Sequence, residues 1–270
     1  HRLSGRSDKE FVRLLEPDDL QRYHLAFENL IDEVAPRTGL RLTSDDYFYR
    51  GLIRQFLRNL PGALEDYSRA LDYDSRNLFA LLNRAQLRID SQEFALAKTD
   101  LDRALQLDPL HPFAFVVRAL WHRGQGDWHA SIDDLTRALI LAPDNVAALI
   151  NRGSAYLAVE RYDEARLDLD RALALTPDSV EGLYYRGRLS QALGQTDAAL
   201  RHFYEAVRLN PDFWFAWSSI AMVVQSRDPQ AALEALRQAL RSCDDADYRD
   251  ALRDNIERLD AALKSRREGR

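Results

Sequence analysis

The sequence has little cysteine, little lysine and no long hydrophobic run. Its single cysteine, Cys243, cannot form a disulfide within the chain, so a disulfide-stapled fold is excluded. No stretch approaches the ~20 consecutive apolar residues of a membrane-spanning helix, and we expect no direct membrane insertion. The formal net charge of −6 leaves no broad cationic surface, which argues against nucleic acid as a partner. The compartment stays open between cytoplasm and periplasm.

Arginine supplies 34 of the 37 basic residues. We attribute this bias to genome composition and take it as an indication of a bacterial source. Because the chain begins at His1 rather than at methionine, we interpret it as a processed protein or a piece of a longer one. With 46% hydrophobic and 30% charged residues, the composition is that of a folded, helix-rich chain.

What the sequence does contain is a repeat of 34 residues. Small side chains recur at this spacing, and the most regular series is Ala70, Ala104, Ala138, Ala172 and Ala206. Another small residue lies seven positions before each of these, two helical turns along the same face. Small residues on facing stripes allow two antiparallel helices to pack closely. A proline then ends each second helix, at Pro109, Pro143, Pro177 and Pro211. We therefore predict an all-α chain of helical hairpins.

These hairpins resemble the tetratricopeptide repeat family. The resemblance covers residues 44–243 and includes a bulky residue early in each hairpin: Tyr47, Leu81, Phe115, Leu149, Leu183 and Trp217. It implies a right-handed superhelical solenoid of six repeats, at residues 44–77, 78–111, 112–145, 146–179, 180–213 and 214–243. Residues 1–43 are then an N-terminal extension with capping helices, and residues 244–270 a C-terminal capping helix with a basic tail. The sequence departs from the family where Ser75 replaces the first expected proline and where the sixth repeat is one residue shorter.

A further departure is an arginine where the family usually has leucine, at Arg50, Arg84, Arg118, Arg152 and Arg186. Aspartates of the same period lie on the predicted second helices, at Asp66, Asp100, Asp134 and Asp168. We expect Arg–Asp pairs between helices, within a repeat or to its neighbour, because an unpaired buried guanidinium is costly. The alternative is a cationic stripe that contacts a ligand. His202 replaces the fifth aspartate, which leaves Arg186 without an in-phase acidic partner.

Apolar stripes predict capping helices at both ends of the stack. The N-terminal stripe consists of Leu20, Tyr23, Phe27, Leu30, Ile31 and Val34, after a shorter helical stretch around Phe11–Leu15. The C-terminal stripe consists of Tyr248, Leu252, Ile256, Leu259 and Leu263.

The sequence lacks the common motifs of catalysis and of cofactor binding. We therefore expect a non-enzymatic protein that needs no cofactor. His111, His122 and His129 lie around the third hairpin, but no obvious carboxylate or thiolate accompanies them, and we predict no metal site. A metal or small-molecule sensor built on these histidines is a third hypothesis for the function.

The resemblance also implies that the first helices line a concave groove for a peptide or helix of a partner protein. We predict the peptide-binding residues from their positions relative to the repeated arginine on each first helix. They are Phe48, Tyr49, Leu52, Phe79, Leu82, Asn83, Gln86, Phe113, Val116, Leu120, Ile150, Asn151, Ser154, Tyr184, Tyr185, Arg188 and Phe215. Ser218 and Met222 extend this set, which is largely apolar and suits a hydrophobic segment. The alternative is that some of these side chains only pack against neighbouring repeats or lie under the N-terminal helices. The best-known binding mode of the family holds the C-terminal carboxylate of a chaperone with lysine, asparagine and arginine at set places along the groove. Here only Asn83 matches that set, which disfavours a chaperone tail as ligand.

We expect a scaffold or adaptor that binds a peptide or helix of another protein. The alternative is a regulatory or targeting domain of a larger enzyme or of a membrane-anchored protein. Exposed aromatic residues would also permit homo-oligomers.

Overall fold

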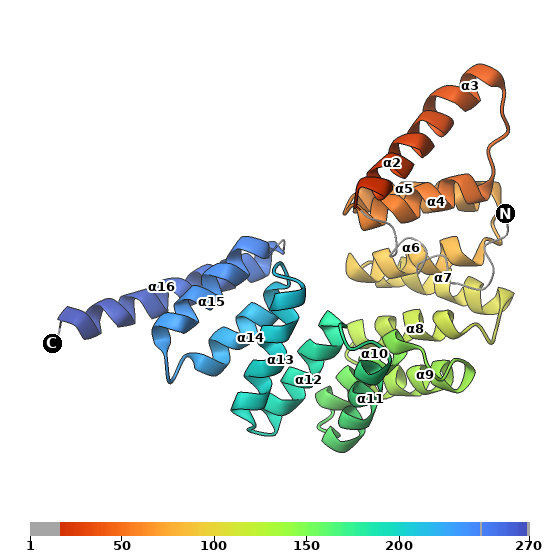
Figure 1. Ribbon diagram of the computed structural model, residues 1–270. Coiled ribbons are helices and arrows are strands. Elements are labelled where there is room, and N and C mark those ends of the chain that lie inside the picture. Colours follow the sequence, from red (N-terminus) through yellow and green to blue (C-terminus); the bar gives the residue numbers. More distant parts are fainter. Residues whose placement is uncertain (1–16, 244, 269–270) are drawn as a thin grey trace. The chain divides into compact units, whose positions relative to one another are not determined.

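The computed structural model describes residues 17–243 and 245–268, and the side chains of residues 21–243 and 245–265. Every regular element in these ranges is a helix, so the prediction of an all-α chain of hairpins is confirmed (Figure 1). Internal contacts divide the chain into two compact units, His1–Leu141 and Ala142–Arg270. We call these the N-terminal unit and the C-terminal unit. No feature of the sequence indicated this division.

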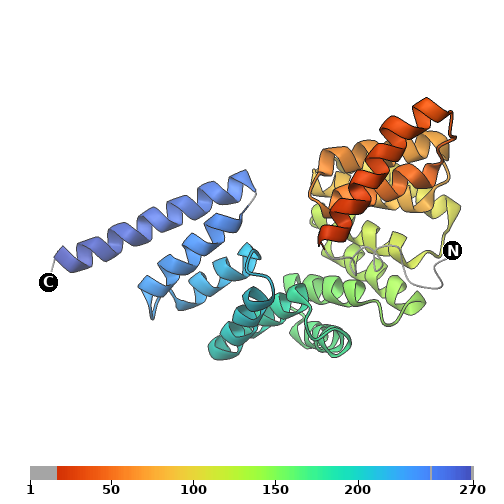
Figure 2. The ribbon, with the colours of Figure 1, turned by 45° about the horizontal axis from the view of Figure 1, so that its top comes forward.

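The N-terminal unit contains three helical hairpins, which lie one beside the next in both ribbon views (Figures 1 and 2). Their helices are α4 (Ser44–Phe56) with α5 (Leu60–Tyr73), α6 (Leu78–Asp90) with α7 (Phe94–Leu107), and α8 (Pro112–Gly124) with α9 (Trp128–Leu141). Tyr67, Leu81 and Leu101 are fully buried in the core between these helices. Within this unit, the helices of each hairpin therefore bury their apolar stripes against each other and against the neighbouring hairpin.

The C-terminal unit contains three more hairpins and a long last helix. Its helices are α10 (Val146–Ala158) with α11 (Tyr162–Leu175), α12 (Val180–Ala192) with α13 (Thr196–Leu209), α14 (Trp214–Val224) with α15 (Pro229–Ser242), and α16 (Ala246–Glu268). Phe203, Ile220 and Leu233 are fully buried in its core. We call the leading helix of every hairpin its first helix and the other its second helix.

Close approach of the two helices explains why a residue next to each arginine is small. A Cβ atom added at Gly51 would lie 2.9 Å from the ring of Tyr67, and one at Gly187 would lie 2.5 Å from the ring of Phe203. The equivalent Ala85 and Ala119 have no exposed surface. Glycine or alanine at this position thus leaves the space that a large side chain of the second helix fills.

The turn inside each of the first five hairpins contains a residue with left-handed backbone geometry, again every 34 residues. These residues are Arg58 (φ 62°), Gln92 (φ 59°), Gly126 (φ 76°), Glu160 (φ 60°) and Gly194 (φ 71°). Only the two glycines adopt this conformation without steric cost. Three of these five turns are therefore strained.

The N-terminal segment packs on the first hairpin but is not one regular helix. It runs through α2 (Pro17–Glu28), a π-helical segment η1 (Asn29–Val34) and α3 (Ala35–Thr38). Ile31 is buried, whereas Tyr23 and Val34 are exposed. A π-helix has more residues per turn than an α-helix and rotates the side chains that follow, so the prediction of one continuous stripe is corrected. The side chain of Leu20 and the stretch Phe11–Leu15 lie outside the described residues.

Helix α16 packs on α15 and shares its core. Leu252 and Leu259 are buried there, and Ile256 and Leu263 are partly buried. Tyr248 lies at the start of α16 and is 53% exposed. Four residues of the predicted C-terminal stripe thus face the core, while Tyr248 belongs to the surface.

Candidate functional site

The repeated arginines are engaged inside the hairpins. In four hairpins, Nε and Nη2 of the arginine donate to both carboxylate oxygens of a buried aspartate on the second helix of the same hairpin. The Nη2–Oδ1 distances are 2.7 Å for Arg50–Asp66, 2.7 Å for Arg84–Asp100, 2.6 Å for Arg118–Asp134 and 2.8 Å for Arg152–Asp168. Paired, doubly hydrogen-bonded charges of this kind hold two helices in register and are unavailable to a ligand.

A second basic side chain reaches the same aspartate in each of the first three hairpins. Arg54 lies 3.1 Å from Asp66, Arg88 lies 2.6 Å from Asp100, and His122 lies 3.6 Å from Asp134. Hydrogen bonds to the aspartates raise the pKa of Arg118 and of Arg152 above the ordinary value. The charged form of these arginines is thus favoured.

The fifth hairpin is different. Arg186 donates from Nε to Oδ1 of Asp170 at 2.7 Å, and Asp170 is an exposed residue of α11 in the preceding hairpin. His202 occupies the position at which the other second helices have their aspartate.

Eight of the predicted peptide-binding residues are buried: Phe48, Leu52, Leu82, Asn83, Val116, Ile150, Ser154 and Tyr184. Asn83 donates from its side-chain amide to the backbone oxygen of Phe79 at 2.8 Å. Each of these eight residues exposes at most 8% of its area, which leaves little or no surface for a ligand. These eight positions are therefore corrected to core positions, the alternative that the sequence left open.

The other predicted residues keep part of their surface. In the N-terminal unit, Phe79 is 44% exposed, and its ring lies 5.7 Å from that of His111 and 6.3 Å from that of Phe48. Around the first helices of that unit, the partly buried residues are Tyr49, Gln86, Phe113 and Leu120. In the C-terminal unit, the accessible residues are Asn151, Tyr185, Arg188 and Phe215.

Several aromatic rings meet on the first helices of the C-terminal unit. The ring of Tyr184 lies 5.1 Å from that of Tyr185, 5.4 Å from that of Phe213 and 6.1 Å from that of Phe215. Phe215 is 40% exposed and lies 6.4 Å from Tyr248. We define the C-terminal aromatic surface as Tyr185, Arg188, Phe213, Phe215, Met222 and Tyr248.

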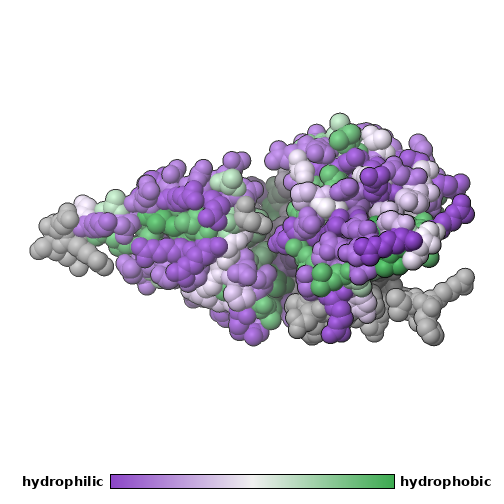
Figure 3. Space-filling model, turned by 90° about the horizontal axis from the view of Figure 1, so that it is seen from above, coloured by the Kyte–Doolittle hydropathy of each residue, from purple (hydrophilic) through white to green (hydrophobic). Residues whose placement is uncertain are grey.

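Arg188 is the cationic member of this surface, and it is bound to a ring beneath it. Its Nη1 donates to the hydroxyl of Tyr184 at 3.0 Å, and its guanidinium carbon lies 5.9 Å from the centre of that ring. Gln191 reaches the sulfur of Met222 at 3.4 Å. In the space-filling view, hydrophobic residues form a band over the C-terminal unit between rows of hydrophilic residues (Figure 3). Of the six residues of the C-terminal aromatic surface, only Arg188 carries a charge.

Sequence reasoning missed Phe213 and Tyr248 as members of this surface. Phe213 directly precedes α14 and does not occupy one of the positions that were counted from the repeated arginines. Tyr248 belongs to the apolar stripe of α16 and looks like a core residue in the sequence. The aromatic triplet Phe213, Trp214 and Phe215 is the signal that could have identified this place.

The three histidines around the third hairpin do not converge. His111 precedes α8 and contacts Phe79, His122 faces Asp134, and His129 is exposed. No group of three or more His, Cys, Asp or Glu side chains in the described part of the chain could hold a metal ion. Among the described helices, none combines the length and apolar character that spanning a membrane requires.

The hairpins and their spacing define an α-helical repeat protein. Residues 82–145, 116–180 and 151–213 match the tetratricopeptide repeat family. Residues 82–213 therefore consist of tetratricopeptide repeats, which confirms the resemblance.

Solved structures show the same fold at low sequence identity. A tetratricopeptide repeat protein of Parabacteroides merdae is similar with a TM-score of 0.70 and 17% identity, over 93% of this chain and 94% of that one. A thermophilic repeat protein of Thermus thermophilus gives 0.61 and 20%, over 67% and 99%. The APC/C hetero-tetramer Cut9–Hcn1 gives 0.74 and 16%, over 89% of this chain, which spans 46% of that chain's length. No curated protein matches the chain.

The tetratricopeptide repeat fold is that of a scaffold for protein–protein interaction, and proteins of this family are generally non-enzymatic. The chain accordingly has the fold of a protein-binding scaffold.

Proposed function

We propose that the chain is an adaptor that binds an apolar peptide or helix of a partner protein on its C-terminal aromatic surface. The observation that supports this most is that Phe215, Met222 and Tyr248 expose 40%, 67% and 53% of their area. The rings of Phe215 and Tyr248 lie 6.4 Å apart, and Met222 follows Phe215 two turns later on the same face of α14. Contiguous exposed apolar residues mark interaction sites, because exposing them to water is unfavourable.

The composition of this surface fits a protein ligand. Tyrosine, phenylalanine, methionine and arginine are enriched at protein interfaces, whereas lysine and glutamate are depleted there. Buried rings beneath it, such as Trp214 stacked at 3.8 Å on Phe215, hold the exposed rings in place. A partner that covers one such side chain gains roughly 1.5–3 kcal/mol from its burial. Two or three covered side chains would therefore contribute roughly 3–9 kcal/mol before the cost of association is subtracted.

The test is affinity capture of partners from extracts of the source organism with purified variants of the chain. Phe215→Asp places a charge in the middle of the surface, and we expect it to remove most of the captured partner. Leu167→Asp is the matched control, because Leu167 is a 69% exposed apolar residue of α11 in the same unit but on a second helix. Far-ultraviolet circular dichroism establishes that each variant keeps its helices.

Capture that survives Phe215→Asp and is lost with Leu167→Asp would move the site to the second helices. Phe79→Asp tests the N-terminal unit in the same experiment. Loss with Phe79→Asp alone would assign the binding to that unit and contradict the proposal.

A further inference from the structure

The second helix of the fifth hairpin, α13, departs from the second helices of the first four hairpins at three nearby positions. His202 replaces their aspartate, as described above. Tyr204 stands where the others have Ser68, Asp102, Thr136 and Asp170. Glu205 stands where all four others have arginine, namely Arg69, Arg103, Arg137 and Arg171. The three changes therefore alter both the shape and the charge of one helix face.

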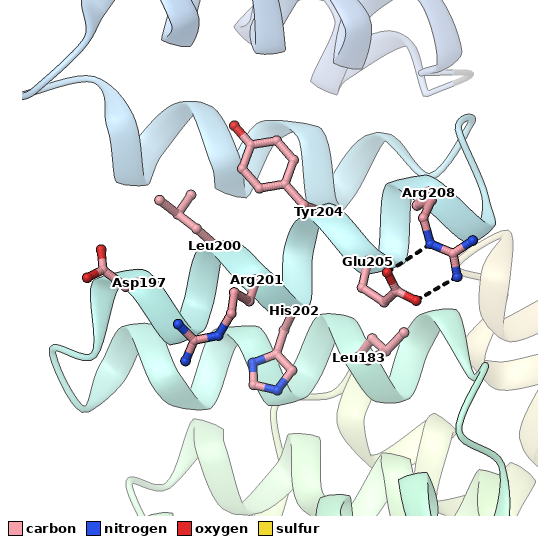
Figure 4. A pocket seen from close by; sticks show the side chains of 8 residues that line it. All are labelled: Leu183, Asp197, Leu200, Arg201, His202, Tyr204, Glu205 and Arg208. Atoms are coloured by element: carbon pink, nitrogen blue, oxygen red, sulfur yellow. Dashed lines mark hydrogen bonds and ion pairs between the residues drawn. The ribbon is translucent and has the colours of Figure 1, made fainter.

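These three side chains line one open pocket of about 730 Å³. The other lining residues are Asp197, Leu200, Arg201 and Arg208 of α13, and Leu183 of α12. In Figure 4, Leu200 and Tyr204 leave α13 on one side, and Arg201 and His202 leave it on the other. The pocket thus has an apolar border and a basic border.

The acidic residues of the pocket already have basic partners. Glu205 accepts two hydrogen bonds from Arg208, at 2.6 and 2.8 Å (Figure 4). Asp197 lies 3.7 Å from Arg227. Arg201, by contrast, forms no ion pair with a carboxylate within the described residues. The charge left uncompensated in the pocket is therefore positive.

His202 adds a titratable group to the basic border. Burial lowers its pKa below the ordinary value, a backbone hydrogen bond at Ala198 opposes this, and the charges of Arg186 on α12 and Arg201 on α13 lower the pKa further. Asp170 on α11 acts in the opposite direction, but its carboxylate is shared with Arg186. These effects favour the neutral imidazole, and a bound anion would favour its protonated form.

We propose that this pocket is a second binding surface, which takes an acidic, apolar segment of a partner protein. An aspartate or glutamate of the partner meets Arg201 and His202, and a neighbouring leucine, isoleucine or aromatic side chain packs on Leu200 and Tyr204. A carboxylate is the group that matches an uncompensated guanidinium beside an imidazole. The apolar border requires that this carboxylate be presented by a hydrophobic stretch of chain.

This surface differs from the one in the proposed function. The C-terminal aromatic surface is built on the first helices α12 and α14 and on α16, whereas the pocket is built mainly on the second helix α13. One partner could occupy either surface alone, so the two proposals can fail separately.

The test is selection of random peptides displayed on phage against the purified full chain, followed by binding measurements with the selected peptides as synthetic probes. We expect enrichment of peptides with Asp or Glu next to Leu, Ile, Phe or Tyr. Arg201→Gln should weaken their binding about fivefold, as expected for loss of one exposed charge pair, and Tyr204→Asp should weaken it more than tenfold. Phe215→Asp, and Arg171→Glu at the position of Glu205 on α11, are the matched controls and should leave the binding unchanged.

Peptides without acidic residues, or binding that only Phe215→Asp removes, would overturn the proposal while leaving the first-helix site intact. A dimer of the chain that Tyr204→Asp abolishes would also overturn it, because the occupant would then be a second copy.

The pH dependence of peptide binding gives an independent check. As the pH falls from about 7.5 to about 6, the affinity of the selected peptides should rise, because the bound carboxylate raises the pKa of His202. His202→Gln should bind with no such rise. The same rise in His202→Gln would exclude the imidazole from the site.

Discussion

Removal of one buried aspartate should show how strongly the arginines depend on their partners. In Asp100→Ala, both Arg84 and Arg88 lose the carboxylate to which they donate at 2.7 and 2.6 Å. Their side chains are only 16% and 15% exposed, so water replaces little of the lost interaction. Breaking a buried ion pair costs about 3–5 kcal/mol. Because Arg84 also donates to Ser68 at 3.1 Å, we expect the lower end, about 3 kcal/mol.

The matched control is Asp102→Ala on the same helix, α7. Asp102 pairs with Lys98 at 2.7 Å, but these side chains are 52% and 54% exposed. An exposed pair of this kind contributes about 0–1 kcal/mol. The assay is urea denaturation followed by far-ultraviolet circular dichroism, in which the midpoint and the slope are compared between the two variants.

Equal destabilisation by Asp100→Ala and Asp102→Ala would refute this reasoning. A second arm replaces the whole cluster, with Arg84→Met, Arg88→Met and Asp100→Leu together. Apolar side chains of similar volume need no partner, so the triple variant should be more stable than Asp100→Ala alone. A triple variant that is less stable than the single one would show that the unpaired guanidinium groups are not the source of the loss in Asp100→Ala.

Three further predictions concern the turns, a titratable group and the helix contacts. Gln92→Gly should raise the unfolding free energy by up to about 1 kcal/mol, because glycine adopts the left-handed conformation of this turn without strain. Gly126→Ala should lower it by about 1 kcal/mol for the opposite reason. Thermal unfolding compares the two variants. Because the pKa of His202 is lowered in the folded chain, the unfolded chain binds protons more readily. The unfolding free energy should therefore fall as the pH decreases through the ordinary pKa of 6.5. His202→Gln should reduce this loss in urea titrations at several pH values. Gly187→Ala should destabilise by about 1–3 kcal/mol, because its Cβ would lie 2.5 Å from the ring of Phe203; an unchanged unfolding midpoint would contradict that account.

The hairpins were predictable from the sequence because each one depends on short-range features. Signals such as the small residue Ala70 and the proline Pro109 are local, and they recur every 34 residues. Because they recur several times, they cannot be chance matches. The N-terminal segment has no second copy for comparison. Its π-helical turn at Asn29–Val34 changes the phase of the apolar residues, and no local signal marks that change.

The candidate site was harder to predict than the fold. Their positions in the repeat predict both Leu82 and Phe215 as peptide-binding residues, yet Leu82 is fully buried and Phe215 is exposed. The difference comes from which neighbours cover each side chain, and those neighbours are set by contacts between hairpins rather than by position within one. The residues of the pocket on α13 were not predicted as a site from the sequence. The only signal there was His202, which interrupts the series of aspartates.

The location of the Arg–Asp pairs determines which hairpins can be exchanged by recombination. Arg84 finds Asp100 within its own 34-residue segment, so a duplicated copy of that segment would carry the paired acid and base together. Arg186 instead takes its carboxylate from Asp170 in the preceding segment. A duplication or deletion that separated the fourth and fifth segments would leave a lone guanidinium behind. These two segments should therefore be inherited as a single block of about 68 residues, twice the 34-residue period.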